Sequence, residues 1–198
     1  PAEVQSSEAA SKEWAFASIY IAPSDFASLT GLDKNAVFER QFPQSQALAD
    51  KLIRFVNSAL VKDQSEDEIE VDLADLLLHL MELSGAAAAP TEALRPYQVD
   101  AIAMRLMDEM SSPPSLHEIA MEHRTTPVNI VRAFTASFGV PPFLWLNIRR
   151  ITEARHRLRR QQTLADVAYD LGYADQAHFT RRFKAATGMT PAQFARMK

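Results

Sequence analysis

Apolar residues recur at helical spacing through most of the chain after residue 45. Residues 45–61 begin with Ser45, a favoured helix-capping residue, and place leucine or valine at about every fourth position. Residues 66–83 carry a broader apolar face behind an acidic start, which suits the positive end of a helix dipole. Both segments predict amphipathic helices. The apolar positions are Leu48, Leu52, Val56 and Leu60 in the first helix, and Ile69, Leu73, Leu76, Leu77, Leu80 and Leu83 in the second.

The segment before residue 45 has weaker patterns. "WAFASIYIAP" predicts a strand at residues 15–21, and "SDFASLTG" predicts a short helix that ends at Gly31. One strand and two amphipathic helices bury too little apolar surface to be stable alone, so this half is expected to need a partner chain or a sheet outside this sequence. The leucines on one face of the helix predicted at residues 66–83 belong either to the core of one chain or to a homodimer seam. We favour the seam, formed by Leu73, Leu76, Leu80 and Leu83.

A run of small residues followed by prolines, "SGAAAAPTEALRP", separates this half from the next. Because it follows a strongly periodic helix and ends at Pro96, a favoured first residue of a helix, we interpret residues 85–95 as a linker. The sequence then divides into a regulatory or dimerisation remnant at residues 1–84, the linker at 85–95, and a helical domain at 96–198.

Two segments of the second half share one pattern of apolar, capping and helix-breaking residues. "SLHEIAMEHRTTPVNIVRAFTASFGVPPFLW" aligns with "TLADVAYDLGYADQAHFTRRFKAATGMTPAQF" if one residue is inserted in the second turn. Each copy predicts a helix, a tight turn, a second helix and a stop. The residues that set these boundaries are Ser115, Thr126 and Gly139 in the first copy, and Thr163, Asp175 and Gly188 in the second.

Two short helices joined by a tight turn form a helix-turn-helix unit, whose second helix enters the DNA major groove. Arg can fork onto guanine, Gln onto adenine, and valine can touch a thymine methyl group. Val128 and Val131 also have the alternative interpretation of core residues. The residues predicted to read bases are Val128, Asn129, Val131 and Arg132 in the first copy, and Gln176, His178 and Arg181 in the second.

A helix predicted at residues 142–160 connects the two copies. Its inner stripe is apolar, and arginines crowd its other faces. A helix of this size is about 28 Å long, close to the roughly 34 Å between successive major grooves on one face of DNA. It can therefore hold two reading heads on adjacent grooves. Arg150 is expected to tie this connector to the first copy, whereas the residues predicted to contact phosphates are Thr126, Arg149, Thr180 and Arg182.

Charge divides the chain in the same way. The net charge of −4 argues against DNA binding, but residues 1–96 hold 7 basic and 16 acidic residues, and residues 97–198 hold 14 basic and 9 acidic residues. An acidic half is thus joined to a half that suits polyanions. There is no cysteine, which excludes disulfides, thiolate zinc sites and cysteine nucleophiles.

"LADVAYDLGYADQAHFTRRFKAATGMTPAQF" resembles the signature of the AraC-type (AraC/XylS) DNA-binding domain nearly throughout, and the resemblance covers residues 114–198. Three positions depart from the family pattern: Pro141 and Trp145 in the first copy, and Ala177 in the second. The acidic half is similar, more loosely, to the end of the family's regulatory domain, where helices that pair two subunits follow a barrel of strands. We expect most of that barrel to precede this sequence.

The resemblance implies a mainly α fold and a bacterial, cytoplasmic transcription regulator that binds double-stranded DNA as a homodimer. It further implies RNA polymerase as a partner, and a small-molecule effector sensed by the upstream barrel. No cofactor and no membrane partner is implied. The alternative is a dimerisation or partner-binding module with only non-specific affinity for DNA.

An enzyme is the least favoured interpretation, because no catalytic constellation is recognisable. "HEIAMEH" superficially resembles a zinc-protease helix, but His117 and His123 are six positions apart, whereas two ligands on one helix face must be four apart. No run of about 18 apolar residues predicts a membrane span.

Overall fold

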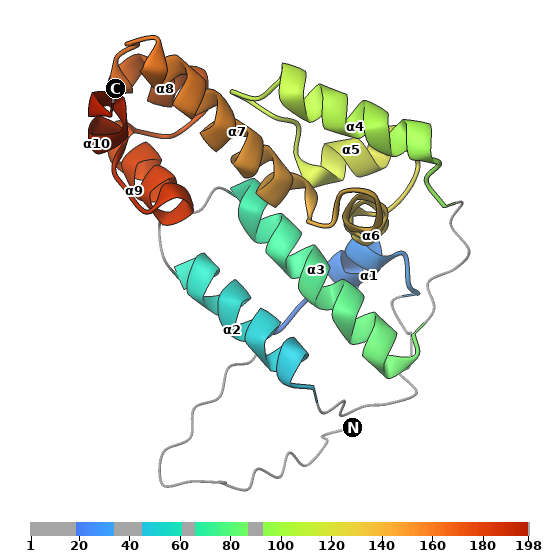
Figure 1. Ribbon diagram of the computed structural model, residues 1–198. Coiled ribbons are helices and arrows are strands. Elements are labelled where there is room, and N and C mark those ends of the chain that lie inside the picture. The colour runs from blue at the N-terminus through green and yellow to red at the C-terminus, as the bar shows by residue number, and fades with distance from the viewer. Residues whose placement is uncertain (1–18, 34–44, 61–65, 87–92, 198) are drawn as a thin grey trace, which may run out of the picture.

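The computed structural model describes residues 19–33, 45–60, 66–86 and 93–197, and every regular element among them is an α-helix (Figure 1). The mainly α fold class is therefore confirmed. Residues 19–21 of the predicted strand form no strand, and its other residues lie outside the described part. The helices are α1 (Pro23–Thr30), α2 (Gln46–Leu60), α3 (Glu66–Ser84), α4 (Pro96–Asp108), α5 (Leu116–Glu122), α6 (Pro127–Phe138), α7 (Pro142–Arg159), α8 (Leu164–Asp170), α9 (Gln176–Thr187) and α10 (Pro191–Arg196).

The predicted boundaries arise from local hydrogen bonds. Thr163 and Asp175 accept the backbone N–H groups of Asp166 and His178 at 3.2 and 2.6 Å, which starts α8 and α9. Ser115 forms a reciprocal capping box with Glu118 at the start of α5, and these hydrogen bonds from Ser115 hold the pKa of Glu118 below its ordinary value. Because each contact spans three residues, the sequence alone could place these helix ends.

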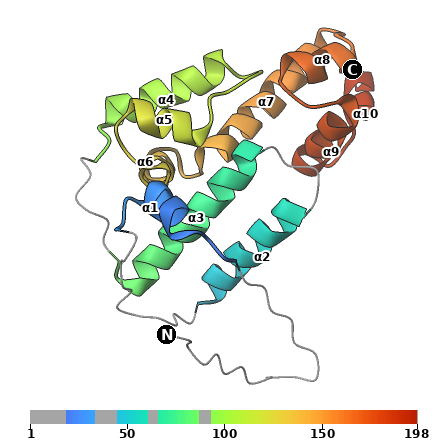
Figure 2. The same cartoon turned by 180° about the vertical axis from the view of Figure 1, so that it is seen from behind.

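The long helix α7 joins two helical clusters. Helices α4, α5 and α6 lie at its beginning, and α8, α9 and α10 lie at its end (Figures 1 and 2). Each cluster has its own apolar centre: Phe134, Trp145 and Leu146 lie in the first, and Phe179 and Phe183 in the second. The two predicted helix-turn-helix units, α5–α6 and α8–α9, are therefore separately packed and share one connector.

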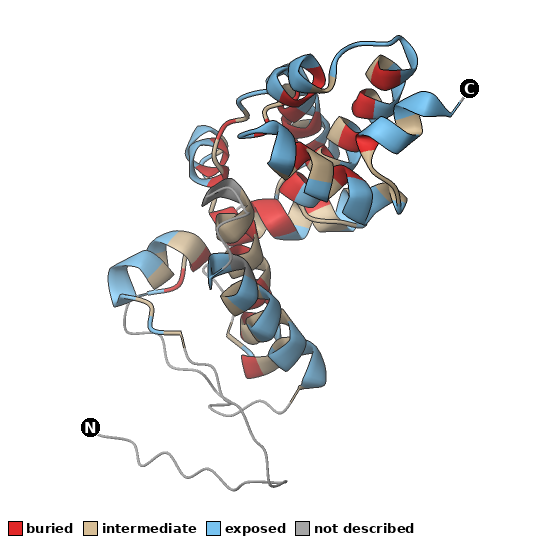
Figure 3. Cartoon of the chain, turned by 90° about the vertical axis from the view of Figure 1, so that its left-hand side faces the viewer, coloured by how far each residue is buried: buried red, intermediate tan, exposed pale blue. Residues whose placement is uncertain are grey.

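Helix α3 belongs to the first of these cores, across the expected linker. Val71, Ala74, Leu77 and Met81 of α3 are buried in one cluster with residues of α4 to α7 (Figure 3). The first half was expected to need a partner chain or a sheet outside the sequence, whereas α3 finds apolar cover on the second half of its own chain. The domain boundary at 85–95 remains a prediction, because the core runs across it.

The predicted dimer stripe is partly occupied within one chain. Leu73 packs against the first core and Leu76 is buried, while Leu80 and Leu83 are half-buried. Helix α2 lies along α3, and Lys51 of α2 forms an ion pair with Asp75 (Figure 1). Dimerisation through the stripe remains a prediction, with less free apolar surface than the sequence indicated.

The turn after α4 fixes the two clusters to each other. Met110 packs against both cores, and its carbonyl oxygen accepts a hydrogen bond from Arg150 Nε at 3.0 Å. A Cβ atom added at Gly172, in the turn between α8 and α9, would lie 2.2 Å from the carbonyl oxygen of Ser111. Arg150 thus has a structural contact, but its partner is the turn after α4, whereas the first copy was expected.

Gly172→Ala should destabilise the protein more than Gly188→Ala. Both glycines have positive φ, 74° and 80°, so alanine costs roughly 1–2 kcal/mol at either position. Only Gly172 faces backbone within contact distance, which should add about 1–3 kcal/mol. Urea unfolding of the two variants measures the difference. Equal losses would show that the turn after α4 does not pack as described.

Candidate nucleic-acid interface

Helix α9 presents a polar face on a rigid base. Its inner side chains, Phe179 and Phe183, are fully buried, and its N-terminus is capped by Asp175. Gln176, Arg181 and Lys184 lie exposed on the outer face. A capped helix with forked and charged donors pointing outward has the form of a major-groove reading helix.

His178 is held beside this face by an aromatic neighbour. Its ring meets Tyr173 edge-on, with 5.4 Å between ring centroids, and Tyr173 packs in turn on Phe179 at 5.1 Å. Burial raises the pKa of Tyr173 to about 12, although the charge of Arg150 acts in the opposite direction. The phenol therefore stays neutral, and it positions the imidazole as a bulky, uncharged support.

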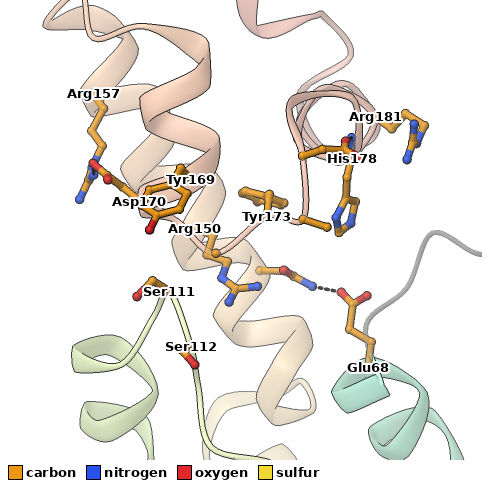
Figure 4. Close-up of a pocket in the computed structure, with 14 residues that line it drawn as sticks. Glu68, Ser111, Ser112, Arg150, Arg157, Tyr169, Asp170, Tyr173, His178 and Arg181 are labelled. Carbon is orange, nitrogen blue, oxygen red and sulfur yellow. Dashed lines mark hydrogen bonds and ion pairs between the residues drawn. The ribbon is translucent and has the colours of Figure 1, made fainter.

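Two residues predicted to contact phosphates have partners within the protein. Arg182 forms an ion pair with Glu68 of α3, which also accepts a hydrogen bond from Asn147 of α7 (Figure 4). Thr180 donates its hydroxyl to the Gln176 carbonyl oxygen at 2.8 Å. In this arrangement the Glu68 carboxylate pairs with the Arg182 guanidinium group, which was expected to contact a DNA phosphate.

The first reading helix differs from the second in what covers it. Val128 and Val131 of α6 are both 0% exposed, because α3 and α1 pack over that side of the helix. Their prediction as base-reading residues is therefore wrong for this arrangement, and the alternative of core residues describes them. A Cβ atom at Gly31, the cap of α1, would lie 3.0 Å from the methyl group of Thr126.

Asn129 and Arg132 remain at the edge of this cover. Arg132 is exposed and donates from a terminal guanidinium nitrogen to Asn129 Oδ1 at 2.8 Å. Thr126 accepts the Asn129 backbone N–H at 3.3 Å as the helix cap. The two polar candidates of α6 therefore bind each other, and Arg132 alone projects fully from the surface.

Most arginines of α7 have structural contacts that the sequence did not reveal. Arg149, the predicted phosphate contact, stacks over Trp145 at 4.8 Å but remains exposed. Arg155 and Arg159 both lie over Phe194, each at 5.5 Å. Arg157 bonds to Glu153 and Asp170, both at 2.8 Å. The basic connector thus uses much of its charge to attach α8 and α10.

A cleft of about 830 Å³ opens beside the α8–α9 unit, and Glu68, Tyr173, His178 and Arg181 all line it (Figure 4). Its walls come from α3, α7, the turn after α4 and the α8–α9 unit. The buried Tyr173 hydroxyl has no hydrogen-bond partner among the described residues. The cleft therefore lies at the junction where α3 meets the second reading head.

Sequence reasoning missed Glu68, Asn147 and Tyr173 as residues of this surface. Tyr173 directly follows the turn glycine, and an aromatic at that place was a usable signal. Glu68 gave none, since its partners lie 79 and 114 positions away along the chain.

The described residues offer no cluster of three side chains suited to a metal ion. In that same part of the chain, no helix is both long and apolar enough to cross a bilayer.

Comparison with known proteins places the second half among helix-turn-helix proteins. Residues 119–197 match a family model described as a helix-turn-helix domain. The chain is 25% identical over 186 residues to the HTH-type transcriptional activator RhaS of Escherichia coli, covering 87% of this chain and 66% of RhaS. It is 31% identical over 61 residues to the virulence regulon transcriptional activator VirF of Yersinia enterocolitica, covering 30% of this chain and 22% of VirF.

Among solved structures, the C-terminal domain of AraT, a response regulator from Geobacillus stearothermophilus, is similar with a TM-score of 0.49 and 24% identity. That likeness covers 55% of this chain and 89% of the AraT domain. The helix-turn-helix match lies on the two units that the connector joins, and the alignment to RhaS extends over most of the chain. The chain is therefore similar to transcriptional regulators of the AraC/XylS family, and residues 119–197 are its helix-turn-helix part.

Proposed function

We propose that this protein binds duplex DNA at specific sequences, with α9 as the principal reading helix. The observation that carries the proposal is the outer face of α9, where Gln176 and Arg181 project from a capped helix anchored by Phe179 and Phe183. Arg181 supplies a fork for guanine and Gln176 a bidentate amide for adenine. His178, braced by Tyr173, contacts the same groove.

Such a DNA site has two blocks of base pairs, one for each reading helix. The first block is read by α9 and the second by α6. Its exposed Arg132 and neighbouring Asn129 are the groups available for base edges. Arg149 of α7 supplies a phosphate contact, and so do Thr126 and Thr180 at the helix starts. Since α7 has 18 residues, it spans about 27 Å, a length that suits two heads on adjacent major grooves.

The proposed partners follow from the family and the fold. The protein acts as a homodimer through α2 and α3, with an effector bound by a sensor domain and RNA polymerase recruited at the promoter. The burial of Val128 and Val131 favours the second candidate function, a partner-binding module in which α6 has lost base reading. Under that alternative, DNA affinity is wholly electrostatic and carries no sequence preference.

Arg181→Ala should weaken binding to a selected site by about 1–3 kcal/mol and abolish the preference at one base pair. The test begins with selection of bound duplexes from a random pool, followed by affinity measurement on the winning sequence. Arg160→Ala, which removes an exposed arginine outside α9, is the control and should retain the preference. A silent Arg181→Ala would favour the partner-binding module.

Arg132→Ala should weaken the other block of the same site, by the same physical reasoning and about the same amount. Footprinting of the two variants on one duplex shows which block each arginine reads. Loss of protection at separate blocks, about one helical turn apart, is the expected result. If Arg132→Ala leaves the footprint and the affinity unchanged, then α6 does not read bases.

A further inference from the structure

The two reading helices are copies of one unit, yet only one has its reading face covered. Val128 and Val131 of α6 correspond to Ala177 and Thr180 of α9 in the sequence repeat. The valines are 0% exposed, whereas Ala177 is exposed and Thr180 is half-buried. Because both helices are held by fully buried inner side chains, Ile130 and Phe134 in α6 and Phe179 and Phe183 in α9, the difference comes from what lies outside α6.

That cover is α3, assisted by α1. Val71, Ala74 and Leu77 of α3 share one buried cluster with Val128 and Val131. Figure 1 shows α3 running past α6 and α7, with its first turns near α9. The apolar middle of α3 thus rests on the first reading head, where base edges would have to lie.

The beginning of α3 is bound to the second head by charge. Glu68 pairs with Arg182 of α9 and accepts a hydrogen bond from Asn147 of α7. Its side chain is only 13% exposed, so this contact is shielded from solvent. One helix therefore contacts both heads, through methyl groups on α6 and through a carboxylate on α9.

A duplex cannot occupy α6 while α3 is there. DNA carries one negative charge per roughly 1.7 Å of axis, and the start of α3 places the carboxylate of Glu68 against α9. Steric exclusion at α6 and repulsion near α9 therefore act in the same direction.

We infer that α3 is an intramolecular competitor of DNA, seated on the reading face of α6 and tied to α9 through Glu68. Binding by both heads requires α3 to leave α6, so the apparent DNA affinity equals the intrinsic affinity multiplied by the fraction of molecules in which α3 is released. This inference rests on the proposed function and names how that same surface is controlled. A signal that loosens α3 strengthens DNA binding.

A covalent lock tests the inference on the full chain. The sequence has no cysteine, so Glu68→Cys with Asn147→Cys introduces the only two thiols, on side chains that touch. After closure with a short bismaleimide, the protein should bind the selected two-block duplex about tenfold more weakly than the same variant left open, within the range typical of coupled sites. Each single-cysteine variant, treated with the same reagent, controls for modification.

A second variant tests release in the opposite direction. Glu68→Gln removes the ion pair with Arg182 and should tighten binding to the two-block duplex by about fivefold. Glu82→Gln removes an equal charge near the other end of α3, and should change affinity much less. Circular dichroism verifies that each variant keeps its helices.

Equal affinity and equal footprints for the locked and open proteins would overturn the inference, even where Arg181→Ala still weakens binding to the selected site. If open protein and Glu68→Gln both lack any sequence preference, and Arg181→Ala is silent, the proposed function itself fails and the inference fails with it.

Discussion

The packing of α3 on α6 is the contact on which the rest of the structure depends. It buries Val128 and Val131, joins the acidic half of the chain to the basic half, and brings Glu68 to α9. Hydrophobic burial supplies the stability of this contact, since it removes the methyl groups of both helices from water. The ion pair between Glu68 and Arg182 fixes the orientation of α3, because a carboxylate shielded from water needs a cation or a hydrogen-bond donor beside it.

Coupling between the two heads has a separate physical basis. The turn after α4 contacts both cores through Met110 and lies directly against Gly172. The Met110 carbonyl oxygen also accepts a hydrogen bond from Arg150 of the connector. These contacts leave the α8–α9 unit little freedom to rotate about α7. A pair of heads with a fixed separation can discriminate the spacing of two DNA blocks, which two heads on a slack linker cannot do.

The connector shows why a count of basic residues overstates a nucleic-acid surface. Arg157 binds carboxylates, and Arg155 and Arg159 lie over Phe194. Guanidinium groups stack on aromatic rings and fork onto carboxylates as readily as they meet phosphates. The packing of α8 and α10 against α7 determines which of these partners each arginine contacts. A row of basic residues on a helix therefore shows which groups the helix can bind, but not which groups it does bind.

The sequence by itself determined the parts of this protein that depend on neighbouring residues. Caps at Ser115, Thr163 and Asp175 act across three positions, and the repeat and the outer face of α9 follow from helical spacing. Only the tertiary structure decided which reading face stays open. A valine such as Val128 can contact a base edge or lie in a core, and here the packing of α3 on α6 buries it. That packing, like the pairing of Glu68 with Arg182, joins residues far apart in the chain. Apolar side chains accept any apolar surface, so periodicity shows that a face is buried without showing against what.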